Sequence, residues 1–283
     1  MKYRIDLHTH TNHSDGTFSP KKLVTEAKKK GLKAIAITDH DTLSGFKEIL
    51  NYKITGIEVI PGIEIGVKSE EERNLVEVHM LGYLINCNDK KFLNVLDKLN
   101  EAKITWLYNQ VKVLNEAGFK ITVKEVKKIA GTAVPRRPHV FKVIEKNNPG
   151  KISREDFFKR TSFGGDLYVK RKFELRLEEC IKLIKKADGI PVLAHPGFYD
   201  MESVVKTAID AGVCGLEVKY FYNNFGKKRS KEIERYLSKL TEKHGLLKTG
   251  GSDFHGNEGG TELGSVYVPY KFLEELKKFK NNF

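Results

Sequence analysis

The sequence predicts an α/β fold in which a barrel of strands and helices carries an inserted helical segment. Short apolar runs alternate with helix-like patterns over residues 1–99 and again over residues 169–283, as in a series of β-α units. Residues 100–168 instead read as successive helices with no strands between them. Histidine and carboxylate residues recur near the ends of apolar runs, and a barrel brings such strand-end residues to one rim.

The first segment opens with a β-α-β pattern. Pro20 suits the first turn of a helix that starts at Ser19, and Gly31 follows that helix where a C-terminal glycine belongs. A helix is also expected after Asp41. The expected helix opened by Ser19 ends at Lys30, and strands are expected over Tyr3–Leu7, Ala34–Thr38, Glu58–Ile60 with an end near Glu64, and Leu75–Leu84.

Helical patterns fill the middle segment between Asn100 and Tyr168. Thr122 and Glu125 have the spacing of a capping box, and Ser153 precedes another helix start. The expected helices of this segment are Ala102–Ala117, Val123–Ile129, Pro138–Asn147 and one beginning over Ser153–Phe158. The β-α pattern then returns over Phe173–Ala187, strand Ile190–Ala194, helix Glu202–Ala211, strand Gly215–Val218, a long helix ending near His244, and strand Leu247–Gly250.

Composition indicates a basic protein of the cell interior. Lys and Arg total 50 against 37 Asp and Glu, a net charge of +13, which attracts phosphorylated substrates or short nucleic acids. The alternative is a Lys-rich surface that only maintains solubility. Cys87, Cys180 and Cys214 lack metal-type spacing and favour reduced thiols. With no apolar leader and no run long enough to span a bilayer, a cytoplasmic location is expected.

Nine side chains are candidates for metal ligands. His8 and His10 are one residue apart, so they project to the same face where the first strand ends. One such pair is a weak signal, but further histidines and carboxylates follow other apolar runs, several beside glycines that allow close backbone approach. The mixture of imidazole and carboxylate suits Zn, Mn or Fe rather than Ca or Mg alone. The full set is His8, His10, Asp15, His40, Glu64, His79, His195, Asp253 and His255.

With these nine positions filled, the sequence resembles the PHP domain family, named for polymerase and histidinol phosphatase. The resemblance spans the chain outside the middle segment. It implies a distorted barrel of seven β/α units around three divalent ions, Mn by resemblance, with Fe or Zn as alternatives. It also implies the grouping of the ligands: His8, His10, Glu64 and Asp253 on one ion; Glu64 bridging to a second ion held by His79 and His195; and Asp15, His40 and His255 on the third.

A closer similarity is to the stand-alone branch that includes nucleoside 3′,5′-bisphosphate phosphatases and 5′→3′ exonucleases acting on short RNA. The middle segment suggests this branch through Arg137-Pro138-His139, and the resemblance implies that Arg137 and His139, with Arg136 as a further candidate, bind substrate phosphate. An arginine offers bidentate phosphate contact, and a helix beginning at Pro138 directs free N–H groups at an anion. His139 binds phosphate, protonates the leaving oxygen, or simply faces solvent. Phe141 stands where the branch has a small residue.

The sequence therefore predicts a metal-dependent phosphoric ester hydrolase in two parts. Residues 1–99 and 169–283 form the barrel with its metal site, and residues 100–168 form a helical insertion that contributes to substrate binding. The expected substrates are nucleoside 3′,5′-bisphosphates or the 5′ ends of short RNA, cleaved by metal-activated water. No membrane association and no obligate protein partner are expected. The alternatives are a histidinol-phosphate phosphatase and a non-catalytic module, stabilised by metal, that binds nucleic acid or protein.

Several residues keep two interpretations at this stage. Asp39 and Asp41 either orient His40 or cap the following helix. The aromatic residues Tyr220, Phe221, Tyr222 and Phe225 either stack on nucleobases or pack a rim loop. His13 and His244 match no ligand position. Substrate length, end preference and oligomeric state stay open.

Overall fold

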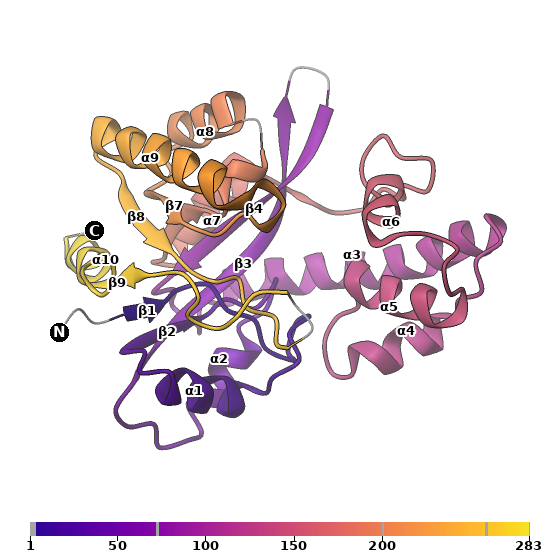
Figure 1. Cartoon of the computed structure of the whole chain (residues 1–283), viewed down its shortest axis with the longest axis horizontal. Coiled ribbons are helices and arrows are strands. Elements are labelled where there is room, and N and C mark those ends of the chain that lie inside the picture. Colours follow the sequence, from indigo (N-terminus) through magenta and orange to yellow (C-terminus); the bar gives the residue numbers. More distant parts are fainter. Residues whose placement is uncertain (1–3, 72–73, 200, 258–259, 283) are drawn as a thin grey trace.

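The computed structural model describes residues 4–71, 74–199, 201–257 and 260–282. One curved sheet forms a nearly closed barrel with helices outside it, and helices α3 to α6 extend to one side (Figure 1). The strands are β1 (Arg4–Asp6), β2 (Ala34–Ile37), β3 (Glu58–Glu71), β4 (Asn74–Tyr83), β5 (Leu175–Arg176), β6 (Ile190–Leu193), β7 (Gly215–Lys219), β8 (Leu247–Gly250) and β9 (Val268–Pro269).

The helices mostly lie where the sequence predicts them. They are α1 (Pro20–Lys29), α2 (Ser44–Ile49), α3 (Lys90–Glu116), α4 (Val123–Ala130), α5 (Arg137–Asn147), α6 (Arg154–Thr161), α7 (Leu177–Lys186), α8 (Met201–Asp210), α9 (Gly226–His244) and α10 (Lys271–Asn281), with short 3-10 turns η1 (Pro196–Phe198) and η2 (Asn223–Phe225). The caps at Ser19 and at Thr122 with Glu125 are confirmed. Of the described helices, none is long and apolar enough to cross a membrane.

The strand order explains how the barrel closes. Neighbours follow the order β8-β7-β6-β4-β3-β2-β1-β9, with β5 beside β3. The amide of Leu7 donates to the carbonyl of Gly250 (3.1 Å), and Thr9 pairs in parallel with Phe254, so the chain after β1 lies against the chain after β8. This closure brings the first and last candidate ligands of the sequence to the same rim.

Two strands depart from a parallel arrangement: β9 is antiparallel to β1, and β4 is antiparallel to its neighbours. β4 is antiparallel to both β3 and β6, whereas β1, β2 and β3 pair in parallel and so do β6, β7 and β8. β3 also continues well beyond Glu64, where an end was expected, because Ile63, Ile65 and Val67 alternate toward the helices that cover the sheet and are buried there. Two residues that the sequence placed differently, Glu64 and His79, therefore both lie within one long hairpin.

Two faces of the sheet bury separate apolar clusters. Alternate residues such as Ile5, Ala34 and Leu81 line the barrel interior, which α10 closes at one end through Leu273 and Leu276. The opposite faces pack on α1 and α2, or on α7, α8, α9 and the first half of α3. The sequence predictions omitted β9 and α10, and the expected start of the first strand at Tyr3 lies outside the described residues.

Helix α3 joins the barrel to the helical segment. The expected helix Ala102–Ala117 begins too late: α3 starts at Lys90, where the Asp89 carboxylate accepts from the amide of Phe92 (2.7 Å). Its first half packs on the barrel, and its second half joins a separate apolar cluster with α4, α5 and α6. The suggested boundary between residues 99 and 100 therefore falls inside a continuous helix.

Candidate metal centre

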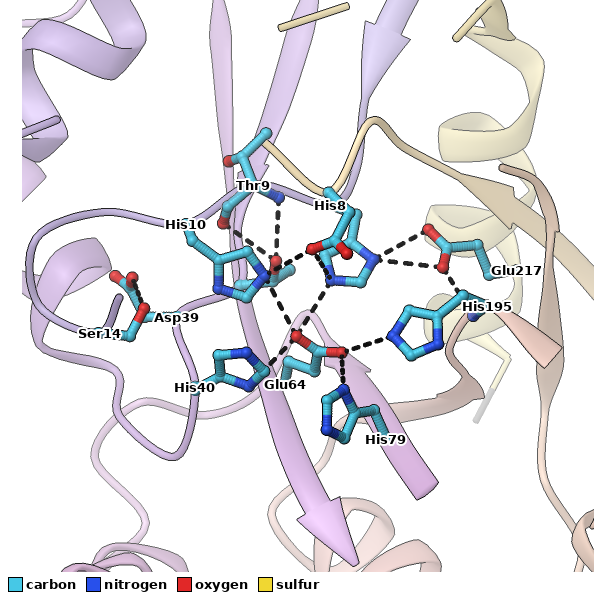
Figure 2. A network of polar contacts seen from close by, with 12 residues as sticks. His8, Thr9, His10, Ser14, Asp39, His40, Glu64, His79, His195 and Glu217 are labelled. Carbon is cyan, nitrogen blue, oxygen red and sulfur yellow. Dashed lines mark hydrogen bonds and ion pairs between the residues drawn. The ribbon is translucent and has the colours of Figure 1, made fainter. Parts of the chain in front are cut away.

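Nine predicted ligand residues meet at one rim of the barrel. Figure 2 shows His8, His10, His40, Glu64, His79 and His195 among them. Each comes from a strand or from the chain that follows one: His8, His10 and Asp15 follow β1, His40 follows β2, Glu64 is in β3, His79 is in β4, His195 follows β6, and Asp253 and His255 follow β8. Because the last two are brought beside the first two by barrel closure, residues 245 positions apart along the chain form one cluster.

Glu64 is the carboxylate at the centre of this cluster and is almost fully buried. Its two oxygens face different imidazoles, as Figure 2 shows. Around Oε2 lie Nε2 of His8 at 3.1 Å, Nε2 of His10 at 3.1 Å and Nδ1 of His40 at 3.3 Å. Around Oε1 lie Nδ1 of His79 at 2.8 Å and Nε2 of His195 at 3.1 Å.

Two further carboxylates lie on the open side of the cluster. Asp253 Oδ1 is 3.3 Å from His8 Nε2 and 3.1 Å from His10 Nε2. Asp15 Oδ1 is 3.3 Å from His255 Nε2 and 3.8 Å from the Nε2 atom of His40. The cluster contains three groups of residues, and within each group the candidate ligand atoms all lie within 4.8 Å of one another. The groups are His8, His10, Glu64 and Asp253; His10, Asp15, His40 and His255; and His40, Glu64 and His79.

The donor atoms of this cluster fit divalent cations. Buried polar atoms normally have hydrogen-bond partners, yet several atoms here have none within the described part of the chain. They include Nε2 of His8 and His10, Nδ1 of His40 and His79, and one oxygen each of Asp15, Glu64 and Asp253. Imidazole nitrogens and carboxylate oxygens that converge without partners are suited to transition-metal ions.

The three carboxyl groups are held in the ionised form that metal binding requires. Burial alone would raise the pKa of Glu64, but the imidazoles of His40 and His8 lower it well below its ordinary value. The pKa values of Asp15 and Asp253 are likewise lowered against the effect of burial, that of Asp15 by His40 and His255 and that of Asp253 by His8 and His255. The cluster is therefore a pre-formed set of negative oxygens among imidazoles.

A buried glutamate that the sequence predictions omitted holds two of the histidines. Glu217 of β7 is fully buried, with Oε1 3.0 Å from Nδ1 of His8, while its Oε2 accepts from the amide of His195 (2.8 Å). An acidic residue inside the apolar strand predicted over Gly215–Val218 was the available signal. The backbone of Gly251 also packs closely against the backbone of His8. A Cβ at position 251 would lie 2.4 Å from the backbone nitrogen of His8, so only glycine allows this contact.

Tyrosines fix other parts of the cluster. The Tyr199 hydroxyl accepts from the amide of His79 (2.9 Å) and lies 3.1 Å from Nδ1 of His195. The Tyr220 hydroxyl donates to Oδ2 of Asp253 (3.0 Å). These contacts leave His79 Nδ1, His195 Nε2 and Asp253 Oδ1 directed at the centre.

Asp39 and Asp41 follow neither of the two interpretations that the sequence allowed. Asp39 accepts from the amide and hydroxyl of Thr11 and the hydroxyl of Ser14, so it fixes the loop that carries Asp15. Asp41 forms ion pairs with Lys103 of α3 and with Arg136, two residues of the helical segment. Neither aspartate caps α2, which starts without a side-chain cap.

Comparison with known proteins identifies the family. The family model for the PHP domain matches residues 6–243. The chain belongs to the PHP domain family. It is accordingly a metal-dependent phosphoesterase. The matched range ends before Asp253 and His255, which the fold brings to the same rim.

Relatives of similar length agree with this assignment. The chain is 29% identical over 93% of its length to the 5′-3′ exoribonuclease of Haemophilus influenzae, 94% of which is covered. It is 27% identical over 92% of its length to the 3′,5′-nucleoside bisphosphate phosphatase of Chromobacterium violaceum, 90% of which is covered. A solved structure from Bifidobacterium adolescentis, assigned as a metal-dependent phosphoesterase, superposes with a TM-score of 0.81 at 28% identity, covering 97% of this chain and 95% of that one.

The PHP domain has a small basic hollow beside the metal centre. It encloses about 110 Å³ and contains the side chains of Lys103, Arg136, Arg137 and Arg171, along with Glu77 and three residues of the cluster. Arg136 is paired with Asp41 (2.6 Å), and Arg137 and Arg171 are both paired with Glu77. Carboxylates outside the metal centre thus hold three guanidinium groups in place beside it.

His139 is more enclosed than the two arginines that precede it. Its ring is 5% exposed, and Nδ1 accepts from the amide of Arg136 (3.1 Å) at the start of α5. Burial lowers the pKa of His139 to about 4, with Asp15 acting in the opposite direction and Arg136 adding to the decrease. The ring is therefore neutral near pH 7. Phe141, which departs from the branch pattern, is buried with its ring 5.3 Å from that of Phe157.

A second, larger hollow also borders Asp15. It encloses about 370 Å³ between the rim loops of the barrel and helices α5 and α6. Tyr220 and Phe221 of the predicted aromatic cluster line it, whereas Tyr222 is fully buried and its hydroxyl accepts from the amide of Gly197 (2.9 Å). Phe225 packs beside Tyr222.

Proposed function

We propose that this phosphoesterase hydrolyses phosphate esters of small nucleotides, nucleoside 3′,5′-bisphosphates above all, and the 5′ ends of short RNA. The observation that carries the proposal is the basic hollow directly beside converging, unpartnered metal-ligand atoms. Relatives with nucleotide and RNA activities in their names, each covered over nearly its full length, support the substrate class.

The nine residues at the rim are the proposed ligands of three divalent ions, with Mn²⁺ as the first candidate and Fe or Zn as alternatives. When bound, such ions lower the pKa of water and offset the negative charge of a phosphate. Both oxygens of Glu64 would serve as ligands, because they face separate sets of imidazoles. His8, His10 and Asp253 form the most enclosed set around it.

The arginines of the helical segment are the proposed contacts for the phosphate that is cleaved. Arg136 and Arg137 line the basic hollow, together with Lys103 and Arg171, and offer donors to non-bridging oxygens. In hydrolysis a water oxygen bonds to phosphorus, the ester P–O bond breaks, and the departing oxygen takes up a proton. We propose that His139, neutral and bonded to the amide of Arg136, orients this phosphate-binding turn.

This assignment gives residues 100–168 a functional role as an inserted subdomain. The segment has its own apolar cluster and supplies Arg136 and Arg137 to the rim of the barrel formed by residues 1–99 and 169–283. Continuous α3 connects it to the barrel, and Asp41 and Glu77 of the barrel pair with Arg136 and Arg137.

The test is metal-dependent product release from three substrates. Purified protein with Mn²⁺ is given a nucleoside 3′,5′-bisphosphate, a short 5′-phosphorylated RNA and histidinol phosphate. Variants His8→Ala and Arg137→Ala are compared with the native chain and with His244→Ala, an exposed histidine of α9. We expect turnover of the first two substrates, its loss in His8→Ala and a lower kcat/KM in Arg137→Ala, with His244→Ala unaffected.

The rival functions give different results in the same assay. Turnover of histidinol phosphate alone would identify the other phosphatase activity. Absence of metal-dependent turnover with every substrate would support a non-catalytic module and overturn the proposal. Thermal unfolding of each variant shows whether lost activity reflects lost folding.

A further inference from the structure

The larger hollow differs from the basic hollow in size and in chemistry. At about 110 Å³ the basic hollow is below the range of roughly 300 to 1,000 Å³ that is typical of small-molecule sites, so it suits a phosphate alone. The larger hollow, at about 370 Å³, falls inside that range. Asp15 and Pro138 border both, so a ligand can extend from one to the other across the metal centre.

Aromatic rings form one wall of the larger hollow. Phe198 is 44% exposed and Phe221 is 37% exposed, which leaves ring surface open to a ligand. Phe198 packs against Tyr220, which also lines the hollow, with ring centroids 5.6 Å apart and the rings nearly perpendicular. Tyr220 is itself anchored to Asp253. The aromatic wall is therefore connected to the metal centre through the contact of Tyr220 with Asp253. Exposed aromatic rings of this kind can stack on any nucleobase.

Cations form the opposite wall. Lys142 of α5 and Arg154 at the start of α6 border the same hollow and come from the helical segment. The Arg154 guanidinium lies 5.1 Å from the ring centroid of Phe158 and 5.7 Å from that of Phe141, which places it over a fixed aromatic surface. The ring of Phe141 thus gives the Arg154 guanidinium an aromatic surface to pack on, which a small residue at position 141 would not provide.

We propose that the larger hollow binds the nucleoside of the substrate together with the phosphate that is not cleaved. The base stacks on Phe198 and Phe221, and the retained phosphate lies between Lys142 and Arg154. The cleaved phosphate then reaches the metal centre and the basic hollow. This inference rests on the proposed nucleotide activity and adds the residues that recognise the base and the second phosphate.

Paired removal of substrate groups and side chains tests this assignment. The substrates are a nucleoside 3′,5′-bisphosphate, the matching 3′- and 5′-monophosphates, and a ribose bisphosphate without a base. The variants are Lys142→Gln, Arg154→Gln, Phe198→Ala and Phe221→Ala. Tyr236→Ala and Lys239→Ala on α9 are the controls, since both are exposed and neither lines the two hollows.

Each variant should lose activity only with substrates that carry its partner group. Lys142→Gln and Arg154→Gln should lower kcat/KM for the bisphosphate by about tenfold and leave the monophosphates nearly unchanged. Phe198→Ala and Phe221→Ala should lower it by roughly tenfold for nucleotides and leave the baseless bisphosphate unchanged. Thermal unfolding confirms that all variants fold.

Two outcomes would overturn the assignment. Equal losses across all substrates, or no losses in any variant, would show that the hollow does not recognise these groups. Because the native chain is measured with the same substrates, failure of the proposed function is separate: it appears as no turnover before any substitution is made.

Discussion

Nδ1 of His8 lies 3.0 Å from a carboxylate oxygen of Glu217, and Nε2 of the same ring faces Glu64 and Asp253. The Nδ1–H group of His8 donates a hydrogen bond to Glu217, so the opposite nitrogen keeps its lone pair directed at the centre of the cluster. A carboxylate behind a metal-binding imidazole fixes the tautomer and the ring orientation. Glu217 thus contributes to the PHP metal centre without pointing into it.

Replacement of this carboxylate should weaken metal binding more than folding. Glu217→Gln keeps the size of the side chain but removes its charge, and we expect metal affinity to fall by about 10- to 100-fold. Activity at limiting Mn²⁺ should fall with it and recover at excess Mn²⁺. Titration calorimetry with Mn²⁺ measures the affinity directly. Unchanged affinity would contradict the role given to Glu217.

Metal removal should destabilise the whole barrel. One oxygen each of Glu64 and Asp253 and both ring nitrogens of His10 are buried without hydrogen-bond partners in the described chain, and a bound cation would satisfy the atoms that face it. A ligand at 100 times its Kd stabilises the folded state by about 2.7 kcal/mol. Thermal unfolding with a chelator, and again after Mn²⁺ is restored, should show a reversible fall in Tm. His8→Ala should show a much smaller shift, and an identical Tm in both conditions would count against the site.

His79 and Glu64 show what periodicity predicts and what it omits. Alternation along Leu75–Leu84 predicted the strand that contains His79, and β4 covers nearly the same residues. The pattern carries no information on strand direction, and β4 is antiparallel to its neighbours. Only the paired hairpin of β3 and β4 explains how a histidine in mid-strand faces the same centre as residues at strand ends.

Contacts made across the fold were harder to predict. Glu217, Tyr199 and Lys103 belong to no local motif, and each acquires its role from a partner more than ten residues away or on another element. The late start assigned to α3 has a similar cause, because its first turns are stabilised by packing on the barrel. By contrast, Thr122 and Glu125 satisfy each other locally, and their capping box was predictable from spacing.

The buried ion pair between Asp41 and Lys103 should control how the helical segment is held. Both side chains are almost fully buried, and Asp41 also binds Arg136. Burial opposes ionisation of Asp41, but Lys103 and Arg136 lower its pKa well below its ordinary value. Removing one partner of a buried pair typically costs about 3 to 5 kcal/mol, so Asp41→Asn and Lys103→Met should both lower the free energy of unfolding strongly.

Urea unfolding measures this effect, with an exposed pair as the control. Lys112→Met in the surface pair with Glu116 should cost less than about 1 kcal/mol. The double variant Asp41→Asn with Lys103→Met should be less destabilised than the sum of the single changes, because Lys103 is no longer left as a buried charge without Asp41, whereas Arg136 loses Asp41 equally in the single and the double variant. Simple additivity would show that the two side chains act independently.

The pH dependence of stability should reveal that His139 is buried in its neutral form. Burial lowers its pKa to about 4 from an ordinary value of 6.5, so the unfolded chain takes up a proton first as the pH falls. The free energy of unfolding should therefore be unaffected by this group above pH 6.5 and decrease between pH 6.5 and 4. The loss amounts to about 3 kcal/mol. His139→Asn removes this titrating group, so the stability difference between native protein and variant should change by that amount across this interval.

His244→Asn, at the exposed end of α9, is the control and should leave the pH dependence of the stability unchanged. Parallel curves for native protein and His139→Asn would mean that His139 titrates freely, and it could then act as a cation toward phosphate rather than as a neutral support for Arg136.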